Sequence, residues 1–509
     1  MWESLQGHSV AKDDAPNLLT RSGMSSAPRT DGPTSPDGCE LRAHIFPLIL
    51  SNKEVLSFLT SLEPQLVHLV QNRLTLPTWM PHEKVQSRLD EKTEDFLKKL
   101  ELPCVRGRPS VLLHKLGDFV EKPELQRRVN GVFRPDAPQH AIFINTSGSG
   151  KTRLLLEGLC QHWGFYYTSH VDSSFLGSVD LQSAIQSIPE DEKFCCHLPP
   201  STSSVSNDKI AGRIFKRVFL ARLLIFHLFI EAMKANTSPD NGFTEGNLID
   251  YRRKWVHFQL QPSFFTKISD PFHDLTHKLS AYLDSELHHL TRDVLDHVRN
   301  TLRSSTSSSG CTPLYWIIDE ARFAAKEHTD AFRSKDMEPR PVLRPLVQTF
   351  TALTSGFDVI ILAGTGLSQS DVDDTMTSGV MKESSYRKCY DTGAFDGWGG
   401  RNGMSSWVKM FVPPWILEEA DRKRLEECMG YWLKGRSAFA FYIYDNILMI
   451  IVFCLPVQID TGLWRVTLPS FFVMGIGNQF SFWTCIFLEP STPNLGSVSE
   501  RRSKGRRRI

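Results

Sequence analysis

Four short apolar segments of the chain end in small, polar or acidic residues. They are HAIFIN (140–145), GFYYTS (164–169), LYWIIDE (314–320) and DVIILAGTGLS (358–368). Short apolar runs bounded by turn-forming residues are typical of buried strands. The chain between them has room for helices, so the pattern predicts an α/β domain with a mostly parallel sheet.

Apolar residues at helical spacing fill much of the remaining chain. The segments 151–164, 178–188 and 271–303 are predicted to be helical. Residues 209–235 are more apolar, but their first half carries several Lys and Arg residues. Because so many charges are costly inside a bilayer, we predict a core helix there and not a membrane span.

The segment NTSGSGKT (145–152) lies between the first strand and the first helix. It matches the phosphate-binding (Walker A) pattern G-x-x-x-x-G-K-[ST] except at Asn145, and strand, glycine turn and helix is the context that pattern requires. Asparagine tolerates a left-handed backbone, so the turn is expected to survive. The alternative is a Ser/Gly loop that only caps a helix. The predicted nucleotide-binding residues are Asn145, Thr146, Ser147, Gly148, Ser149, Gly150, Lys151 and Thr152.

Within this loop each residue type has its own expected task. The glycines let backbone N–H groups turn toward phosphate, and the helix N-terminus adds partial positive charge. Lys151 is expected to reach the β and γ phosphates, and the Thr152 hydroxyl to hold Mg²⁺.

The segment LYWIIDE supplies the second candidate motif, with the character of a Walker B strand. A buried strand that ends in Asp-Glu can present two carboxylates to a nucleotide. Asp319 is predicted to bind Mg²⁺ and Glu320 to polarise the attacking water as general base. The alternative is an ordinary strand that ends in a solvated acidic turn.

The strand at 358–368 places Thr365 at its carboxyl end, where ligands bind in open α/β sheets. Thr365 is therefore a candidate sensor of the γ-phosphate, although a threonine that merely begins a loop is an equal alternative. The long separation of Lys151 from Asp319 and the Asp-Glu pair favour the catalytic-glutamate division of phosphate-loop proteins. No N-K-x-D or T-K-x-D sequence follows for guanine recognition, which favours ATP.

Other polar groups give weaker signals. Arg322, Arg340 and Arg344 are candidates for stabilising charge on the phosphates, although surface ion pairing is the more common role. His273 and His277 stand four apart, but no third ligand accompanies them in the sequence. No Ser/His/Asp or Cys/His arrangement is supported by the spacing.

The composition is that of an ordinary globular protein. Among the 509 residues 41% are hydrophobic and 23% charged, and the net charge of +1 implies no general attraction to nucleic acid or membrane. The ten cysteines form no C-x-x-C pair, which argues against a zinc ribbon or a disulfide framework. The N-terminus has no signal-peptide pattern. An intracellular location, cytoplasmic or nuclear, is expected.

The C-terminal residues 437–509 are apolar without a clear period and end in RRSKGRRRI. One interpretation is a membrane hairpin with spans near 437–456 and 468–488. Polar residues interrupt both spans, so we favour the second interpretation, a truncated domain or an aberrant gene model. The basic tail is either a nuclear-import or nucleic-acid patch or simply solvated.

Taken together, INTSGSGKTRLLLEGLCQHWGFYYTS, DSSFLGSVDLQ, YWIIDEAR, ILAGTGLS and FVPPWIL…YWLKGR resemble phosphate-loop proteins of mushroom-forming (basidiomycete) fungi. These are similar to the nucleotide-hydrolase part of Crinkler-type proteins, and the resemblance covers roughly residues 105–436. It implies an ATPase core like that of AAA+ and STAND proteins, sometimes joined to a nuclease or another effector module. The matching positions are Gly148, Gly150, Lys151 and Thr152 in the loop, with Asp319 and Glu320 at the strand end.

We therefore expect a P-loop NTPase that binds ATP with Mg²⁺, hydrolyses it and switches conformation. The alternatives are a nucleotide-gated scaffold with negligible turnover, or a Crinkler-like effector with an associated nuclease. An unknown protein partner or self-association is expected. The predicted divisions are a disordered tail (1–40), a helical region (41–130), the NTPase domain (131–415) with a helical insertion (209–303), the helical start of a C-terminal region (416–436) and the apolar C-terminus (437–509).

Overall fold

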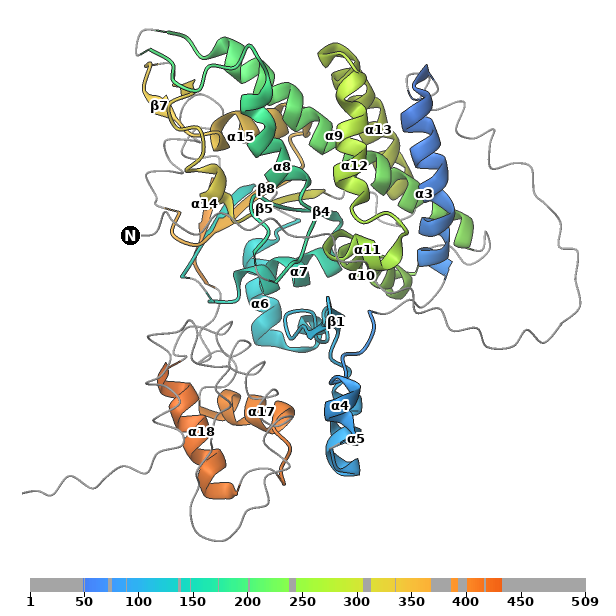
Figure 1. Cartoon of the computed structure of the whole chain (residues 1–509), viewed down its shortest axis with the longest axis vertical. Coiled ribbons are helices and arrows are strands. Elements are labelled where there is room, and N and C mark those ends of the chain that lie inside the picture. Colours follow the sequence, from blue (N-terminus) through green and yellow to red (C-terminus); the bar gives the residue numbers. More distant parts are fainter. Residues whose placement is uncertain are drawn as a thin grey trace, which may run out of the picture. The chain divides into compact units, whose positions relative to one another are not determined.

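A computed structural model describes residue 49 and residues 51–432, with gaps at 72–75, 88, 136–138, 147, 173, 200–201, 238–243, 305–312, 335, 368–385, 392–400 and 416–417. The described residues belong to one compact unit that begins at Leu48. Figure 1 shows a central sheet with helices on both of its sides. The predicted tail 1–40, the C-terminal segment 437–509 and its two candidate membrane spans lie outside the described residues.

The central sheet has five parallel strands in the order β4-β5-β8-β3-β9. Their bounds are β3 His140–Ile144, β4 Gly164–Thr168, β5 Tyr315–Asp319, β8 Val359–Gly364 and β9 Tyr386–Cys389. The four strands predicted from the sequence are confirmed, and the sheet is the expected parallel one. Strand β8 lies between β3 and β5, so it pairs with both. The edge strand β9 was not predicted.

Alternate side chains of β5 mark the two faces of the sheet. Trp316 stacks on Phe219 of α9 (Val205–Asn236), with ring centroids 4.0 Å apart, and also meets Phe350 of α15 (Leu343–Leu353). Tyr315 points the other way, toward Phe133 and His162. Helices α9 and α15 therefore cover one face, and α6 (Pro123–Val132) and α7 (Lys151–Gln161) cover the other (Figure 1).

The predicted core helix is longer than expected, since α9 spans 32 residues and its second half is buried almost all round. Around it pack α3 (Lys53–Gln71), α8 (Asp180–Ser187), α12 (Pro271–Lys278) and α13 (Asp284–Ser304). Among the described residues, none of the helices combines the length and apolar character needed to cross a bilayer.

The segment 271–303, predicted as one helical stretch, is two helices joined by a 3₁₀ turn, η3 (Leu279–Ala281). Two contacts explain the break. The Glu286 carboxylate accepts the Leu283 N–H at 2.7 Å and so caps α13, while Arg213 of α9 donates to the Tyr282 carbonyl at 2.9 Å.

The remaining elements complete the described chain. They are α4 Glu83–Gln86, α5 Glu91–Leu100, β1 Cys104–Val105, β2 Arg108–Pro109, η1 Asp118–Glu121, η2 Ile188–Glu190, α10 Glu245–Leu260, α11 Pro262–Phe265, α14 Ala321–Ala324, β6 Phe332–Arg333, β7 Pro339–Arg340, α17 Arg401–Phe411 and α18 Glu419–Trp432.

Candidate functional site

The loop 145–152 connects β3 to α7 at the carboxyl end of the sheet. Gly148 and Gly150 have φ angles of +75° and +91°, a left-handed conformation that glycine adopts without cost. Helix α7 begins at Lys151 with Gly150 as N-cap, and no side chain caps it. The first N–H groups of a helix have no partner within the helix, so this end presents donors to the loop. Ser147 lies outside the described residues.

Asn145 does not adopt the left-handed backbone that the sequence led us to expect, since its φ is not positive. Its side chain fixes the start of the loop instead. Asn145 Oδ1 accepts the N–H of Thr146 at 2.7 Å, and Asn145 Nδ2 donates to the carbonyl of Tyr390 at 2.7 Å. The residue in the unusual first position therefore ties the loop to the end of the edge strand β9.

The Lys151 ammonium closes the loop. It donates to the carbonyls of Asn145 at 3.0 Å and Thr146 at 2.9 Å, and to Thr365 Oγ1 at 3.0 Å. The side chain is buried, and burial lowers the pKa of Lys151, while Asp319 and Glu320 oppose that shift. The structure thus brings Thr365, at the end of β8, to the predicted lysine.

Asp319 ends β5 beside the start of α7. Its Oδ2 accepts hydrogen bonds from Thr152 Oγ1 at 2.8 Å and from the Tyr166 hydroxyl at 3.0 Å. A hydroxyl oxygen and a carboxylate oxygen this close together are suitable ligands for a hard divalent cation. Tyr166 was missed by the sequence analysis. The Tyr166 hydroxyl reaches Asp319 only because β4 pairs with β5, and the sequence does not reveal which strands are neighbours.

Glu320 follows directly and lies in the left-handed region with φ +50°. Its N–H donates to Asp319 Oδ1 at 2.9 Å, and Glu320 is the N-cap of the short helix α14. Burial raises the pKa of Glu320 to about 7, with a further contribution from Asp319, whereas Lys151 opposes it. A carboxyl that titrates near neutral pH is suited to accept a proton.

Ser149 offers another polar group beneath the loop. Its hydroxyl is buried and has no hydrogen-bond partner among the described residues. A buried hydroxyl without a partner costs roughly 1–3 kcal/mol. Together with the uncapped start of α7, it leaves the loop with polar groups that a ligand rich in oxygen atoms can satisfy.

The three candidate arginines lie in different surroundings. Arg344 makes an ion pair with Asp208 at 3.3 Å, and Arg340 donates to the carbonyl of Pro339 at 3.2 Å. Arg322 is exposed and its charge lowers the pKa of Glu320. Its guanidinium also lies over Gly366, where an added side chain would meet it at 3.1 Å. Of the three, Arg322 is the arginine of the site.

The segment 111–121 packs against α7 at Arg153 and Glu157, within two turns of the loop. Arg153 donates to the carbonyls of Leu112, His114 and Lys115 at 2.7–2.8 Å. The buried Glu157 carboxylate accepts the N–H of Gly117 at 3.1 Å and pairs with Arg153 at 2.6 Å. The helix that begins at Lys151 is therefore anchored to the N-terminal part of the described chain.

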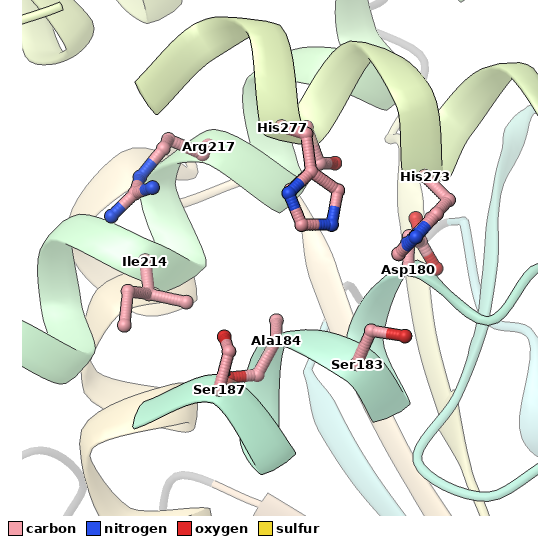
Figure 2. A pocket seen from close by; sticks show the side chains of 9 residues that line it. Asp180, Ser183, Ala184, Ser187, Ile214, Arg217, His273 and His277 are labelled. Atoms are coloured by element: carbon pink, nitrogen blue, oxygen red, sulfur yellow. The ribbon is translucent and has the colours of Figure 1, made fainter. Parts of the chain in front are cut away.

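A small cavity lies away from this site, between α8, α9 and α12. Figure 2 shows Arg217, His277 and Ser183 around it, with His273 at one side. The His273 and His277 rings are 4.5 Å apart. Within the described part of the chain no third ligand joins these two histidines, so the weak metal pair suggested by their spacing gains no support.

The structure thus brings together Lys151, Thr152, Asp319, Glu320 and Thr365 from three strand ends, with Asn145 and Thr146 beneath the lysine. In comparisons with known proteins, no family model, no curated protein and no solved structure matches the chain.

Proposed function

We propose that the chain binds ATP with Mg²⁺ at the loop 145–152 and hydrolyses it. The observation that carries the proposal is the 2.8 Å contact between Thr152 and Asp319, which lie 167 positions apart in the sequence. It joins the two segments that the sequence singled out for one metal ion, at the carboxyl end of the sheet, where α/β proteins bind their ligands.

Phosphate binding would use the loop backbone and Lys151. The uncapped N-terminus of α7 favours an anion through its N–H groups and its dipole. Lys151 holds two loop carbonyls, which fix the ammonium at the mouth of the loop. Its third contact, with Thr365, is the one that a γ-phosphate would share or replace. Thr365 would then register whether the γ-phosphate is present.

Bound Mg²⁺ would neutralise developing charge on the phosphates. Thr152 and Asp319 are the residues that would hold it, with Tyr166 orienting the Asp319 carboxylate. Glu320 would take the proton of the attacking water. Its left-handed backbone turns it away from the line of β5, while the hydrogen bond from its N–H keeps it beside Asp319.

The sheet order supports the catalytic-glutamate division of phosphate-loop NTPases. In that division a strand separates the phosphate-loop strand from the strand with the acidic pair, and β8 lies between β3 and β5 in this way. We extend the proposal to an AAA+- or STAND-like switch related to the NTPase part of Crinkler-type proteins, acting inside the cell. Its further partner would be a protein or a second copy of the chain.

One observation favours a second candidate, a nucleotide-gated scaffold with negligible turnover. With its pKa raised to about 7, Glu320 carries its proton for much of the time at neutral pH. A protonated carboxyl cannot act as general base, so the fraction of chains able to hydrolyse ATP would fall as the pH drops below about 7, unless a bound cation lowers that pKa.

The test measures Mg²⁺-dependent ATP binding and steady-state phosphate release with the full chain. We expect Lys151→Ala to abolish binding, and Glu320→Gln to bind ATP without turnover. Lys193→Ala and Glu327→Gln, which replace a lysine and a glutamate outside the site, should behave like the parent. GTP competition tests the choice of base.

Three results separate the candidates. A parent that releases phosphate, together with a Glu320→Gln variant that keeps ATP binding and loses hydrolysis, supports the ATPase. A parent that binds ATP but releases no phosphate supports the scaffold. A parent that binds no ATP, or a Lys151→Ala variant that binds it as well as the parent, contradicts both.

A further inference from the structure

A second group of potential ligands lies outside the loop site, between helices α9 and α13. His227 and Glu231 stand four positions apart on α9, and His297 faces them from α13. One ligand atom from each residue lies within 4.8 Å of the other two. Residues four apart share one face of a helix, so the two α9 side chains approach His297 together.

We propose that His227, Glu231 and His297 form a binding site for a divalent transition-metal ion, with Zn²⁺ as the ion that fits best. Two imidazoles and one carboxylate are a common set of protein ligands for Zn²⁺, and the set leaves a fourth position for water. Harder ions such as Mg²⁺ prefer oxygen ligands throughout. The proposal does not depend on nucleotide binding.

The distances suit that ion. His297 Nε2 and Glu231 Oε1 are 3.3 Å apart. Two ligands of a tetrahedral ion with bonds of about 2.0–2.1 Å are separated by about 3.3 Å. The ligand atoms of all three residues lie within 4.8 Å of one another, so a bound ion would draw them together. The His227 and His297 rings already lie 4.8 Å apart, edge to face.

Burial prepares the ligands for a cation. His227 is buried, and burial lowers its pKa to about 4, with a further contribution from His297. Its imidazole is therefore neutral at physiological pH, which is the form that binds metal. Glu231 and His297 are partly exposed, at 20% and 29%, so an ion has a path of entry.

Lys234 is the competing charge. It lies 3.3 Å from Glu231 Oε1 and occupies part of the carboxylate that the metal would use. Metal binding must displace this lysine from the carboxylate. Binding should therefore be stronger when Lys234 is neutralised.

A bound ion would join two helices that pack against each other. α9 packs on the sheet through Phe219, and α13 is the last described helix before β5. The ion would thus link the two helices, and its stabilisation of the folded chain would grow with the logarithm of the free Zn²⁺ concentration once that concentration exceeds Kd.

The experiment titrates the full chain with ZnCl₂ against a chromogenic chelator, in an Asp319→Asn background that removes the carboxylate of the loop site. We expect one equivalent of Zn²⁺ and a rise in the melting temperature. His297→Gln and Glu231→Gln should each weaken binding more than about tenfold. Lys234→Gln should strengthen it. His288→Gln, on the same helix α13, and His273→Gln are the matched controls and should bind like the parent.

Cobalt provides an independent readout, because a tetrahedral Co²⁺ site gives visible absorption that His297→Gln should abolish. The proposal fails if the chain binds no stoichiometric Zn²⁺. It also fails if His288→Gln weakens binding as much as His297→Gln does. In either case the three residues serve only as a hydrogen-bonded contact between helices.

Discussion

At the residue scale, two adjacent tyrosines of β4 have different surroundings. The Tyr166 hydroxyl donates to Asp319, whereas the buried Tyr167 hydroxyl has no hydrogen-bond partner among the described residues. We expect Tyr166→Phe to lower the free energy of unfolding by about 1–3 kcal/mol, because the bond is to a charged group. Tyr167→Phe should be neutral or stabilising. Urea denaturation measures both, and equal losses would contradict the assignment of Tyr166 to the site.

The raised pKa of Glu320 predicts a pH dependence of both activity and stability. If Glu320 is the general base, kcat/KM should rise with pH through a midpoint of about 7. Because the folded chain holds this proton to higher pH than the unfolded chain, the contribution of Glu320 to stability is greatest below about 4.5 and is lost as pH rises through about 7. Glu320→Gln should remove that decline, which chemical denaturation across this range can test.

At the element scale, helix α7 carries a glycine where another helix presses against it. A side chain at Gly158 would come within 2.0 Å of the Phe133 ring, which is fully buried at the end of α6. Gly158→Ala should therefore destabilise the fold by about 1–3 kcal/mol through overpacking. Gly131→Ala is the matched control. That position in α6 has open space around it, so alanine should stabilise the helix by up to about 1 kcal/mol.

Thermal unfolding of both glycine variants measures this difference. A stable Gly158→Ala variant would mean that Phe133 can move away from α7. The sequence predicted α7 correctly from its leucines, but it gave no sign of this contact, because Phe133 lies 25 positions away, directly after α6.

Prediction from sequence worked best where a local pattern determines the outcome. The apolar runs before Asn145, Glu320 and Thr365 are strands, and they deliver the predicted residues to one edge of the sheet. The sequence missed β9, which contains Arg387 and Lys388 and survives as a strand because it lies at the sheet edge. It also missed Tyr166 and His297, whose partners are distant in the sequence and are met only through packing.

At the scale of the whole molecule, β8 joins the two halves of the sheet. Ile361 pairs with Ile317 of β5 on one side and with Ala141 of β3 on the other. All residues of β8 are buried, so its amides should exchange with solvent only when the whole unit unfolds. The two-stranded β1–β2 pair should exchange sooner. Hydrogen exchange followed by mass spectrometry tests this, and equal rates would show that the sheet opens locally.

Replacing Ile361 by Ala should cost about 2–5 kcal/mol, because it leaves a cavity where three strands meet. Leu283→Ala is the control, since that leucine is 62% exposed. The pairing of β8 with β3 also spans 220 positions, from Ala141 to Ile361. Contacts between residues this far apart in the sequence are slow to form, because a long chain segment must first be ordered. Refolding should therefore be slower than that of helical proteins of similar size.

The contact between Arg153 and the segment 111–121 has a consequence for how the sequence can vary. Arg153 binds three main-chain carbonyls, which every amino acid supplies. Substitutions at Leu112 and Lys115 therefore leave the carbonyl acceptors in place. Any substitution at position 153 removes all three hydrogen bonds. Among related sequences, the arginine after Thr152 should therefore be retained, whereas the residues whose carbonyls it binds should vary.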